Sequence, residues 1–335
     1  MDFKNGTAAF IIPFFGANEL AFKFLDETLQ GIIAQTDKNF RILLVDDCSP
    51  YQGTKEYLDK IQAEYQETIR IIFNRANEGP GACRNTGIRW ACEHDYPIIL
   101  FNDADDLSHC RRLEVVRKIF VEDPGTSVVY STVKVIDENG KLVTRDKLAP
   151  SILEIIEGHD VDPVEGDNAW IRIGVEKGYT NFTSATSAHT VLAFQYLFPP
   201  LRVSEDSHTW MRYSAGGGKF FYAPEIPTLY RIPQNSDGSS SRSRAGGRHL
   251  FNIQKIETDT AGFLESMEIA VGKSKIKSEE KDDLLARFYK KLAETMAKEN
   301  ELQLAKDLTE QAMAISRKQA IEPERNKLAK PASKN

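Results

Sequence analysis

Three carboxylates fall within four residues at Asp103-Ala104-Asp105-Asp106, directly after an apolar run. Carboxylate oxygens on a tight loop can hold a hard divalent cation, which can in turn bridge the oxygens of a diphosphate. The same spacing recurs at Asp160-Val161-Asp162, but no comparable run precedes it, so we assign that pair to a solvated loop. Position after a predicted strand therefore favours 103–106 as the metal-binding segment.

A second acidic segment, Val45-Asp46-Asp47-Cys48-Ser49, also follows an apolar run. A carboxylate there can accept a hydrogen bond from a base N–H or a ribose hydroxyl, whereas it would repel phosphate unless a metal intervened. We expect this segment at the nucleoside end of a ligand. For Asp46 or Ser49 alone, a helix cap or a turn is an equally good interpretation.

A third segment, 77–87, combines glycines with one arginine. Gly79 and Gly81 permit close backbone approach before a helix that we expect to begin near Ala82. Arg84 offers a planar group of donors to a base or phosphate oxygen. The segment matches neither the dinucleotide-binding nor the P-loop glycine pattern, so we reject both of those sites.

A fourth segment, 204–212, begins with the acidic pair Glu205-Asp206. Such a pair can supply a general base for a reaction at the metal loop, although distance along the chain says nothing about distance in space. Without further context, an acidic pair at this position more often marks the exposed start of a helix.

The elements that position these segments begin with four apolar runs, which alternate with stretches of helical period. This alternation is typical of βαβ units and a parallel sheet. Between the first two runs we expect a helix capped by Asn18. Each run ends in polar or glycine-rich residues, and ligands of open parallel sheets bind at the carboxyl ends of the strands. The runs are Ala8 to Phe14, Phe40 to Val45, Ile69 to Phe73 and Ile98 to Phe101.

Beyond residue 111 the alternation fades. We expect a helix to Glu122, one strand from Val128 to Val135, a helix over 204–213, and strands at 220–222 and 228–232. After residue 250 the sequence is charged and favours helices, with one apolar stripe behind a cap at Ser278 and a second from Leu304 to Ile315. We expect this helical pair to pack on the rest of the chain; a surface for protein contacts is the alternative.

Composition excludes several classes of protein. The 335 residues are 41% hydrophobic, enough for a buried core, and the net charge of −6 argues against binding to nucleic acid or an anionic membrane. The four cysteines lack the spacing of a zinc site. The apolar run 7–15 is too short for a transmembrane segment and lacks signal-peptide flanks. We expect a cytoplasmic protein, with peripheral membrane association through a partner left open.

Taken in order, the four segments resemble the family 2 inverting glycosyltransferases with the GT-A fold. The resemblance covers most of residues 7–232 and includes Ile11-Ile12-Pro13-Phe14-Phe15 at the first strand. It implies an α/β fold with a mostly parallel open sheet flanked by helices, here with a C-terminal helical appendage. We expect residues 1–110 to be the nucleotide-sugar-binding half and 111–250 the acceptor-binding half of one domain, with a helical segment at 251–320 and a disordered tail at 321–335.

The resemblance also implies roles for single residues. Pro13 and Phe15 would line the base pocket, Asp47 would meet the base edge and Arg84 would support it. Asp103 would contact the ribose and Asp105 would coordinate Mn²⁺ or Mg²⁺ on the diphosphate. Asp206 resembles the general base, with Glu205 and Trp210 in the acceptor site. The remaining donor-site candidates are Phe14, Asp46, Asn77, Gly81 and Ala104.

The sequence departs from the family pattern at two places. Many relatives carry a histidine soon after a Tyr-Arg pair, but here Tyr230-Arg231-Ile232 is followed by Pro233. Candidates for the missing diphosphate contact are Arg244, Arg248 and His249; a loop that orders only over bound diphosphate is equally consistent. The first motif also has Phe14-Phe15-Gly16 where many relatives have a tyrosine followed by asparagine.

The expected activity is therefore inverting transfer of a sugar from a nucleotide-diphosphate donor, with UDP favoured by family habit. The expected acceptor is a carbohydrate or glycolipid hydroxyl, in polysaccharide or glycoconjugate synthesis. A nucleotidyltransferase is the alternative enzyme, but segment 14–18 has no basic residue for a triphosphate. A non-catalytic nucleotide-sugar-binding scaffold is the alternative outside enzymes, and retention of Asp103, Asp105 and Asp206 argues against it.

Overall fold

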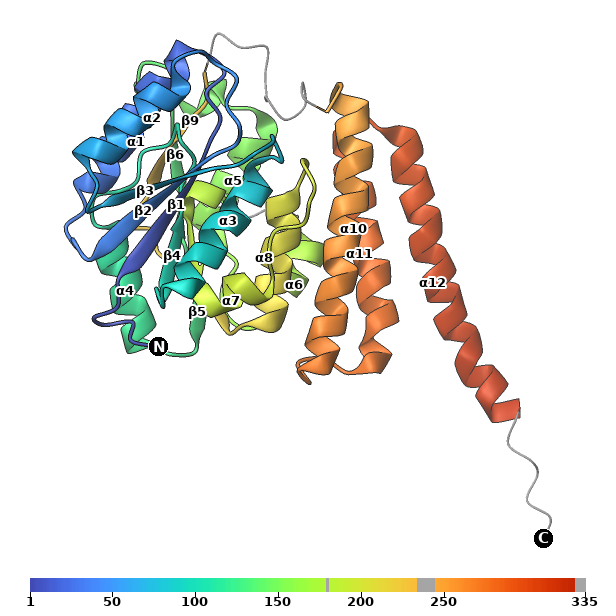
Figure 1. The fold of residues 1–335 in the computed structure, drawn as a ribbon. Helices are drawn as coiled ribbons and strands as arrows, with labels where there is room; N and C mark the ends of the chain where they lie inside the picture. Colours follow the sequence, from blue (N-terminus) through green and yellow to red (C-terminus); the bar gives the residue numbers. More distant parts are fainter. Residues whose placement is uncertain (179–180, 234–244, 329–335) are drawn as a thin grey trace.

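The computed structural model describes residues 1–178, 181–233 and 245–328. Its centre is a seven-stranded sheet in the order β3-β2-β1-β4-β7-β5-β8 (Figure 1). The first four strands run parallel and match the predicted apolar runs to within one residue. They are β1 (Ala8–Phe14), β2 (Phe40–Asp46), β3 (Ile69–Phe73) and β4 (Ile98–Phe101). Their carboxyl ends therefore share one edge of the sheet, as predicted.

The second half of the sheet is mixed. β7 (Thr186–His189) runs antiparallel to both β4 and β5 (Thr126–Tyr130), and β8 (Lys219–Tyr222) runs parallel to β5. The sheet is therefore mostly parallel, and the predicted α/β fold class is confirmed.

Helices cover both faces of the sheet. The side chains of β1 alternate between the two faces, so each face presents apolar residues that the helices bury. Phe10 and Ile12 lie in the core beneath α1 (Glu19–Ile33), α2 (Thr54–Glu64) and α4 (Arg112–Glu122). Ile11 faces the opposite core, beneath α3 (Pro80–Glu93). The predicted cap of α1 is confirmed, since the Asn18 side chain accepts a hydrogen bond from the Ala21 N–H at 3.2 Å.

The single strand predicted from Val128 to Val135 is wrong. β5 ends at Tyr130, and the N–H of Ser131 turns to the carbonyl of Ala185. The chain then enters β6 (Val133–Ile136), which pairs with β9 (Thr228–Arg231) in a separate two-stranded sheet. A stretch rich in strand-favouring residues thus crosses from one sheet to another, and its composition does not reveal the break.

The predicted loop at Asp160-Val161-Asp162 is also wrong in part, because Asp160 and Val161 end α5 (Pro150–Val161). Asp160 pairs with Arg145 at 2.6 Å, and Asp162 caps the helix. This acidic pair therefore lies on the surface in ordinary ion pairs.

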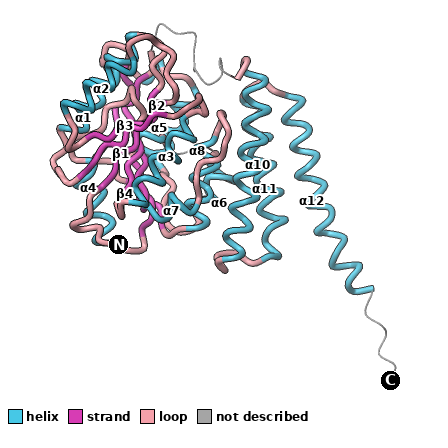
Figure 2. The backbone as a smooth tube through the Cα atoms, in the orientation of Figure 1, coloured by secondary structure: helices cyan, strands magenta, loops and turns pink. Residues whose placement is uncertain are grey.

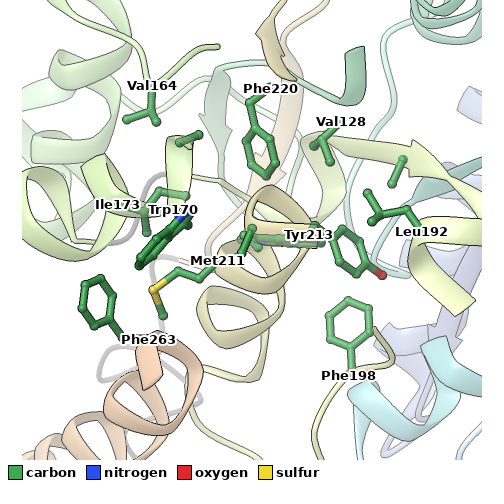
Figure 3. Packing of buried hydrophobic residues seen from close by; sticks show 14 of the residues in the cluster. Val128, Val164, Trp170, Ile173, Leu192, Phe198, Met211, Tyr213, Phe220 and Phe263 are labelled. Carbon is green, nitrogen blue, oxygen red and sulfur yellow. The ribbon is translucent and has the colours of Figure 1, made fainter. Parts of the chain in front are cut away.

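The larger core joins the sheet to the helices beyond it (Figure 3). α6 (Ala169–Arg172), α7 (Thr190–Gln195) and α8 (Glu205–Gly216) cover this face. Met211 of α8 and Trp170 of α6 lie beside Phe263 of α10, with the Trp170 and Phe263 ring centroids 5.2 Å apart. The C-terminal helices thus share a core with the sheet domain.

Three long helices complete the described chain: α10 (Arg248–Gly272), α11 (Lys281–Lys298) and α12 (Leu302–Leu328). Figure 2 shows them side by side, with α10 against α8, and α12 extending away from the sheet. The predicted helical pair corresponds to α11 and α12, whereas α10 was not predicted as a separate helix. Ser278 lies in a short 3₁₀ turn before α11 rather than at its cap. α12 includes residues 321–328 of the predicted tail.

Among the described helices, none combines the length and the apolar composition needed to cross a membrane.

Candidate active site

The acidic loop after β4 is held by hydrogen bonds from two sides. The Asn102 side chain donates to the carbonyls of Asp103 and Asp106 at 2.8 and 3.1 Å. The Thr28 hydroxyl on α1 donates to the carbonyls of Ala104 and Asp106 at 3.0 and 3.1 Å. The backbone of the loop is therefore fixed before any ligand arrives.

Arg231, at the end of β9, fastens the same loop from a third side. Its backbone N–H donates to Asp106 Oδ1 at 2.7 Å, and its Nε donates to the Asp105 carbonyl at 2.8 Å. The guanidinium is fully buried and pairs with Glu27 of α1 at 2.6 Å. Arg231 therefore links β9, α1 and the acidic loop in one network.

Arg84 connects this loop to the second acidic segment. Its Nη2 donates to Asp103 Oδ1 at 2.7 Å, and its Nη1 donates to Glu205 Oε1 at 3.1 Å. The guanidinium is 5.3 Å from the ring centroid of Phe198 and only 3% of the residue is exposed. Burial disfavours its charge, but Asp103 and Glu205 outweigh burial and raise the pKa of Arg84. The arginine is a permanently charged bridge between α3, β4 and α8.

Glu205 and Asp206 occupy the first turn of α8 but have different surroundings. Glu205 is buried, and burial together with the charge of Asp206 raises the pKa of Glu205 to about 7, despite Arg84. Asp206 is half-buried; its Oδ1 accepts from the Ser207 N–H at 2.8 Å and its Oδ2 from the Thr183 hydroxyl at 3.4 Å. The two carboxyls are thus differentiated by environment, as acids with different roles often are.

The phenol of Tyr230 is affected by carboxylates of both the acidic loop and α8. Burial, followed by the charges of Asp106, Asp103, Asp105 and Asp206, raises the pKa of Tyr230 well above its ordinary value. Charges act strongly only over short distances. Together with the two hydrogen bonds of Arg84, this indicates that the acidic loop lies near the start of α8, a hundred residues later in sequence.

Residues 9–181, about half of the chain, match the model of glycosyl transferase family 2. The chain belongs to glycosyltransferase family 2. The resemblance stated from its motifs is thereby confirmed.

Proteins with similar sequences are also named as glycosyltransferases. The chain is 29% identical over 238 residues to the uncharacterized glycosyltransferase MJ1057 of Methanocaldococcus jannaschii, covering 70% of this chain and 74% of that one. It covers only 18% of the length of two Rickettsia glycosyltransferases that match 35% of this chain.

Solved structures show the same GT-A fold. TarS of S. aureus in complex with UDP-GlcNAc has a TM-score of 0.53 at 16% identity, with 91% of this chain and 90% of that chain covered. The mannosyltransferase PcManGT of Pyrobaculum calidifontis, in complex with GDP-Man and Mn²⁺, has a TM-score of 0.56 at 18% identity, with 98% and 82% covered. The predicted fold is therefore confirmed for this glycosyltransferase.

Asp47, which follows β2, organises the loop after β3. Its carboxylate accepts hydrogen bonds from the backbone N–H groups of Glu78 and Gly79 at 2.9 and 2.8 Å, and only 4% of the residue is exposed. Arg202 donates to the Asn77 side chain at 2.8 Å from the opposite side. Asp46 accepts from the Ser49 hydroxyl, which supports its interpretation as a turn residue.

Two glycines of the third segment allow close packing. A Cβ on Gly87 would lie 2.6 Å from Ile11 Cγ2, so only glycine lets α3 approach β1 this closely. A Cβ on Gly81 would lie 3.4 Å from atoms of Glu205 and Phe198. Asn85 fixes the same contact, exchanging two hydrogen bonds with the Phe198 backbone at 2.8 and 2.9 Å.

The candidate residues that would contact the base or the acceptor through apolar side chains differ in exposure. Phe15 is 45% exposed at the end of β1, and Pro13 is half-buried, whereas Phe14 is buried in the core. Trp210 is 1% exposed, and its ring packs against Phe101 at 5.7 Å between centroids. Phe15 is thus available to a base, whereas a contact between Trp210 and an acceptor is not supported.

The carboxylates of the acidic loop suit a divalent cation that binds together with its substrate. Asp103 and Asp105 are half-buried carboxylates on a fixed loop. In the described part of the chain, no three or more His, Cys, Asp or Glu side chains converge to hold a metal by themselves. Mg²⁺ is commonly held by one or two carboxylates together with substrate phosphates, and Mn²⁺ also prefers oxygen ligands.

Of the three candidate diphosphate contacts, two are paired with glutamates near the end of α11, and the third lies outside the described residues. Arg248 pairs with Glu299 at 3.7 Å, and His249 lies 2.8 Å from Glu301, both at the turn between α11 and α12. Arg244 lies outside the described residues.

From the sequence, Tyr230-Arg231 served only as a landmark for a missing histidine. The structure instead places Arg231 among the residues that hold the acidic loop. The only sequence signal was an arginine at the end of a predicted strand, which is too common to single out.

Proposed function

We propose that this glycosyltransferase transfers a sugar, with inversion, from a nucleoside diphosphate donor to a hydroxyl of a carbohydrate or glycolipid acceptor. The observation that carries the proposal is the bridge that Arg84 makes between Asp103 of the acidic loop and Glu205, the neighbour of Asp206 at the start of α8. This arrangement supplies a donor-holding side and a proton-accepting side to one reaction. Its role lies in polysaccharide or glycoconjugate synthesis.

Asp206 acts as the general base. As the acceptor oxygen attacks the anomeric carbon, Asp206 takes the hydroxyl proton and the bond to the diphosphate breaks on the opposite face. A single displacement of this kind inverts the configuration, so an α-linked donor gives a β-linked product. Asp206 suits this role better than Glu205, because Glu205 is buried and held by Arg84.

The acidic loop holds the donor. Asp105 binds Mn²⁺ or Mg²⁺, and Asp103 accepts a hydrogen bond from the ribose. When bound, the cation neutralises charge that grows on the departing diphosphate. Because Arg231, Thr28 and Asn102 fix the loop, these carboxylates need little rearrangement on binding.

The nucleoside end is formed by Phe15, Pro13 and the loop that Asp47 holds. Since both carboxylate oxygens of Asp47 accept backbone N–H groups, Asp47 positions the base-binding loop. UDP is the proposed nucleotide. The similar structures were solved with UDP-GlcNAc and with GDP-Man, so GDP is the main alternative.

The proposal is tested with a panel of UDP- and GDP-sugars, with and without Mn²⁺. Wild type should release nucleoside diphosphate from one of them and form an inverted product with a sugar acceptor. Asp105→Ala should lose Mn²⁺-dependent donor binding. Asp160→Ala, which alters the surface acidic pair, is the matched control and should bind normally. Metal-independent nucleotidyl transfer, or no turnover with any donor, would overturn the proposal.

A further inference from the structure

The C-terminal helix α10 contacts the residue that immediately precedes the acidic pair of α8. The Ser204 hydroxyl donates to Asp259 Oδ1 at 2.6 Å, across 55 positions of sequence. Asp259 is 5% exposed and is ion-paired with Lys255, one turn earlier on α10. A buried carboxylate with two partners is therefore aimed at the start of α8.

Ser204 has a backbone conformation that needs support. Its φ of 59° lies in the left-handed region, which residues with a Cβ rarely adopt. Its carbonyl accepts the first hydrogen bond of α8, from the His208 N–H at 3.1 Å. The conformation of Ser204 therefore sets the direction in which Glu205 and Asp206 leave the preceding loop.

α10 also packs closely against α8. A Cβ on Gly262 would lie 2.8 Å from the His208 Cα, so the two helices touch at the backbone. Farther along, Glu265 lies 3.5 Å from His208 and 3.6 Å from Arg212. The Asp259 carboxylate is thus held at a fixed distance from Ser204 by the packing of the two helices.

We propose that Asp259 is a positioning residue for the transfer reaction: by holding Ser204 in its left-handed conformation, it orients Asp206 toward the acceptor hydroxyl. The C-terminal helices then contribute to catalysis rather than only to stability. This inference rests on the proposed role of Asp206 as the base. It requires that a change on α10 reduce turnover while donor binding persists.

Four variants separate this role from a general structural one. Asp259→Ala removes the acceptor for Ser204, whereas Asp259→Asn keeps an oxygen acceptor. Asp259→Ala combined with Ser204→Gly lets the backbone adopt positive φ without a partner. Glu257→Gln changes an exposed residue of the same helix and is the matched control.

Turnover is followed as Mn²⁺-dependent release of nucleoside diphosphate from UDP-GlcNAc or GDP-mannose. Asp259→Ala should lower kcat roughly 10- to 100-fold, as a misplaced catalytic group does, with donor KM unchanged. Asp259→Asn and Glu257→Gln should stay near wild type. Adding Ser204→Gly to Asp259→Ala should restore several-fold of the lost kcat. An unchanged kcat in Asp259→Ala, or equal losses of kcat and donor binding without rescue, would overturn the inference.

Amide hydrogen exchange provides a readout that does not require activity. In Asp259→Ala, exchange at the His208 amide should accelerate about tenfold or more, because its acceptor is the Ser204 carbonyl. Exchange near Tyr213 should not change. Uniform acceleration along α8 would indicate general destabilisation and contradict the proposal. If wild type turns over neither donor while the local effect is present, the proposed function fails but the coupling between α10 and α8 stands.

Discussion

Arg84 lies between Asp103 and Glu205 and donates to both carboxylates, at 2.7 and 3.1 Å. One buried cation therefore joins the loop that follows β4 to the start of α8. The resemblance to the family implied support of the base edge by Arg84. The hydrogen bonds place its guanidinium between Asp103 and Glu205, and a contact with a base stays a prediction.

Removing the positive charge of Arg84 should lower both the stability of the protein and its turnover. Arg84→Met leaves two carboxylates without their partner, and breaking a buried ion pair in this way typically lowers the free energy of unfolding by about 3–5 kcal/mol. Urea unfolding and donor turnover measure the two effects. Arg111→Met, which breaks an exposed pair with Glu114, is the control and should change neither. Unaltered stability in Arg84→Met would show that the bridge is unimportant.

Glu205 should make stability dependent on pH. Its pKa is raised from 4.5 to about 7, so the folded state binds its proton more tightly than the unfolded state. Its stabilising contribution is complete below pH 4.5 and is lost as pH rises to about 7. The charged groups beside it are Asp206 and Arg84.

In Glu205→Gln this dependence disappears. The free energy of unfolding of wild type should therefore fall, relative to that of the variant, between pH 5 and pH 8, by on the order of 1–3 kcal/mol. Denaturant titrations at several pH values measure the difference. The exposed Glu154→Gln is the control. Parallel pH profiles for wild type and Glu205→Gln would refute the assignment.

Gly87 should tolerate no side chain. Its Cβ would lie 2.6 Å from Ile11 Cγ2 in the strand below, so Gly87→Ala should lower the free energy of unfolding by about 1–3 kcal/mol. Gly158→Ala, in α5 with nothing within 4 Å, is the matched control and should stabilise by roughly 0.5–1 kcal/mol. Thermal or urea unfolding of both variants checks the pair. Equal effects at the two sites would contradict the close packing of α3 on β1.

A substitution of Arg231 should weaken the binding of Mn²⁺ more than the binding of the nucleoside. Arg231→Lys keeps a charge for Glu27 but removes the donor to the Asp105 carbonyl. We expect the Mn²⁺ concentration for half-maximal donor binding to rise about 10- to 100-fold, as for other residues that orient metal ligands. Calorimetric titration of donor at several Mn²⁺ concentrations measures it. The exposed Arg145→Lys is the control, and a shift of equal size there would sink the interpretation.

The sequence was sufficient for the first half of the fold. The runs at β1 to β4 are short and apolar because both faces are covered, and parallel strands place their following loops at one edge. Asp47 and Asp103 could therefore be assigned to a common edge without coordinates. The sequence was also sufficient for the cap at Asn18, because capping depends only on neighbouring residues.

Long-range pairing could not be predicted in the same way. The partners of Arg84 lie 19 and 121 positions away, and Asp259 lies 55 positions from Ser204. α10 was missed as a separate helix because its buried residues contact α8 and α6 as well as α11, which blurs a single apolar stripe. The burial of Trp210 against Phe101 could not be predicted either, because the direction of its side chain on α8 is not encoded locally.

The central claim is that Asp206 receives the acceptor proton while the loop after β4 holds the donor. Asp206→Asn tests it most directly, because the amide keeps the shape of the side chain but cannot act as a base. Donor binding in the presence of Mn²⁺ should stay within about twofold of wild type, while kcat should fall by roughly 10²–10⁴. Normal turnover in Asp206→Asn, with the donor bound as tightly as in wild type, would show that another group accepts the proton.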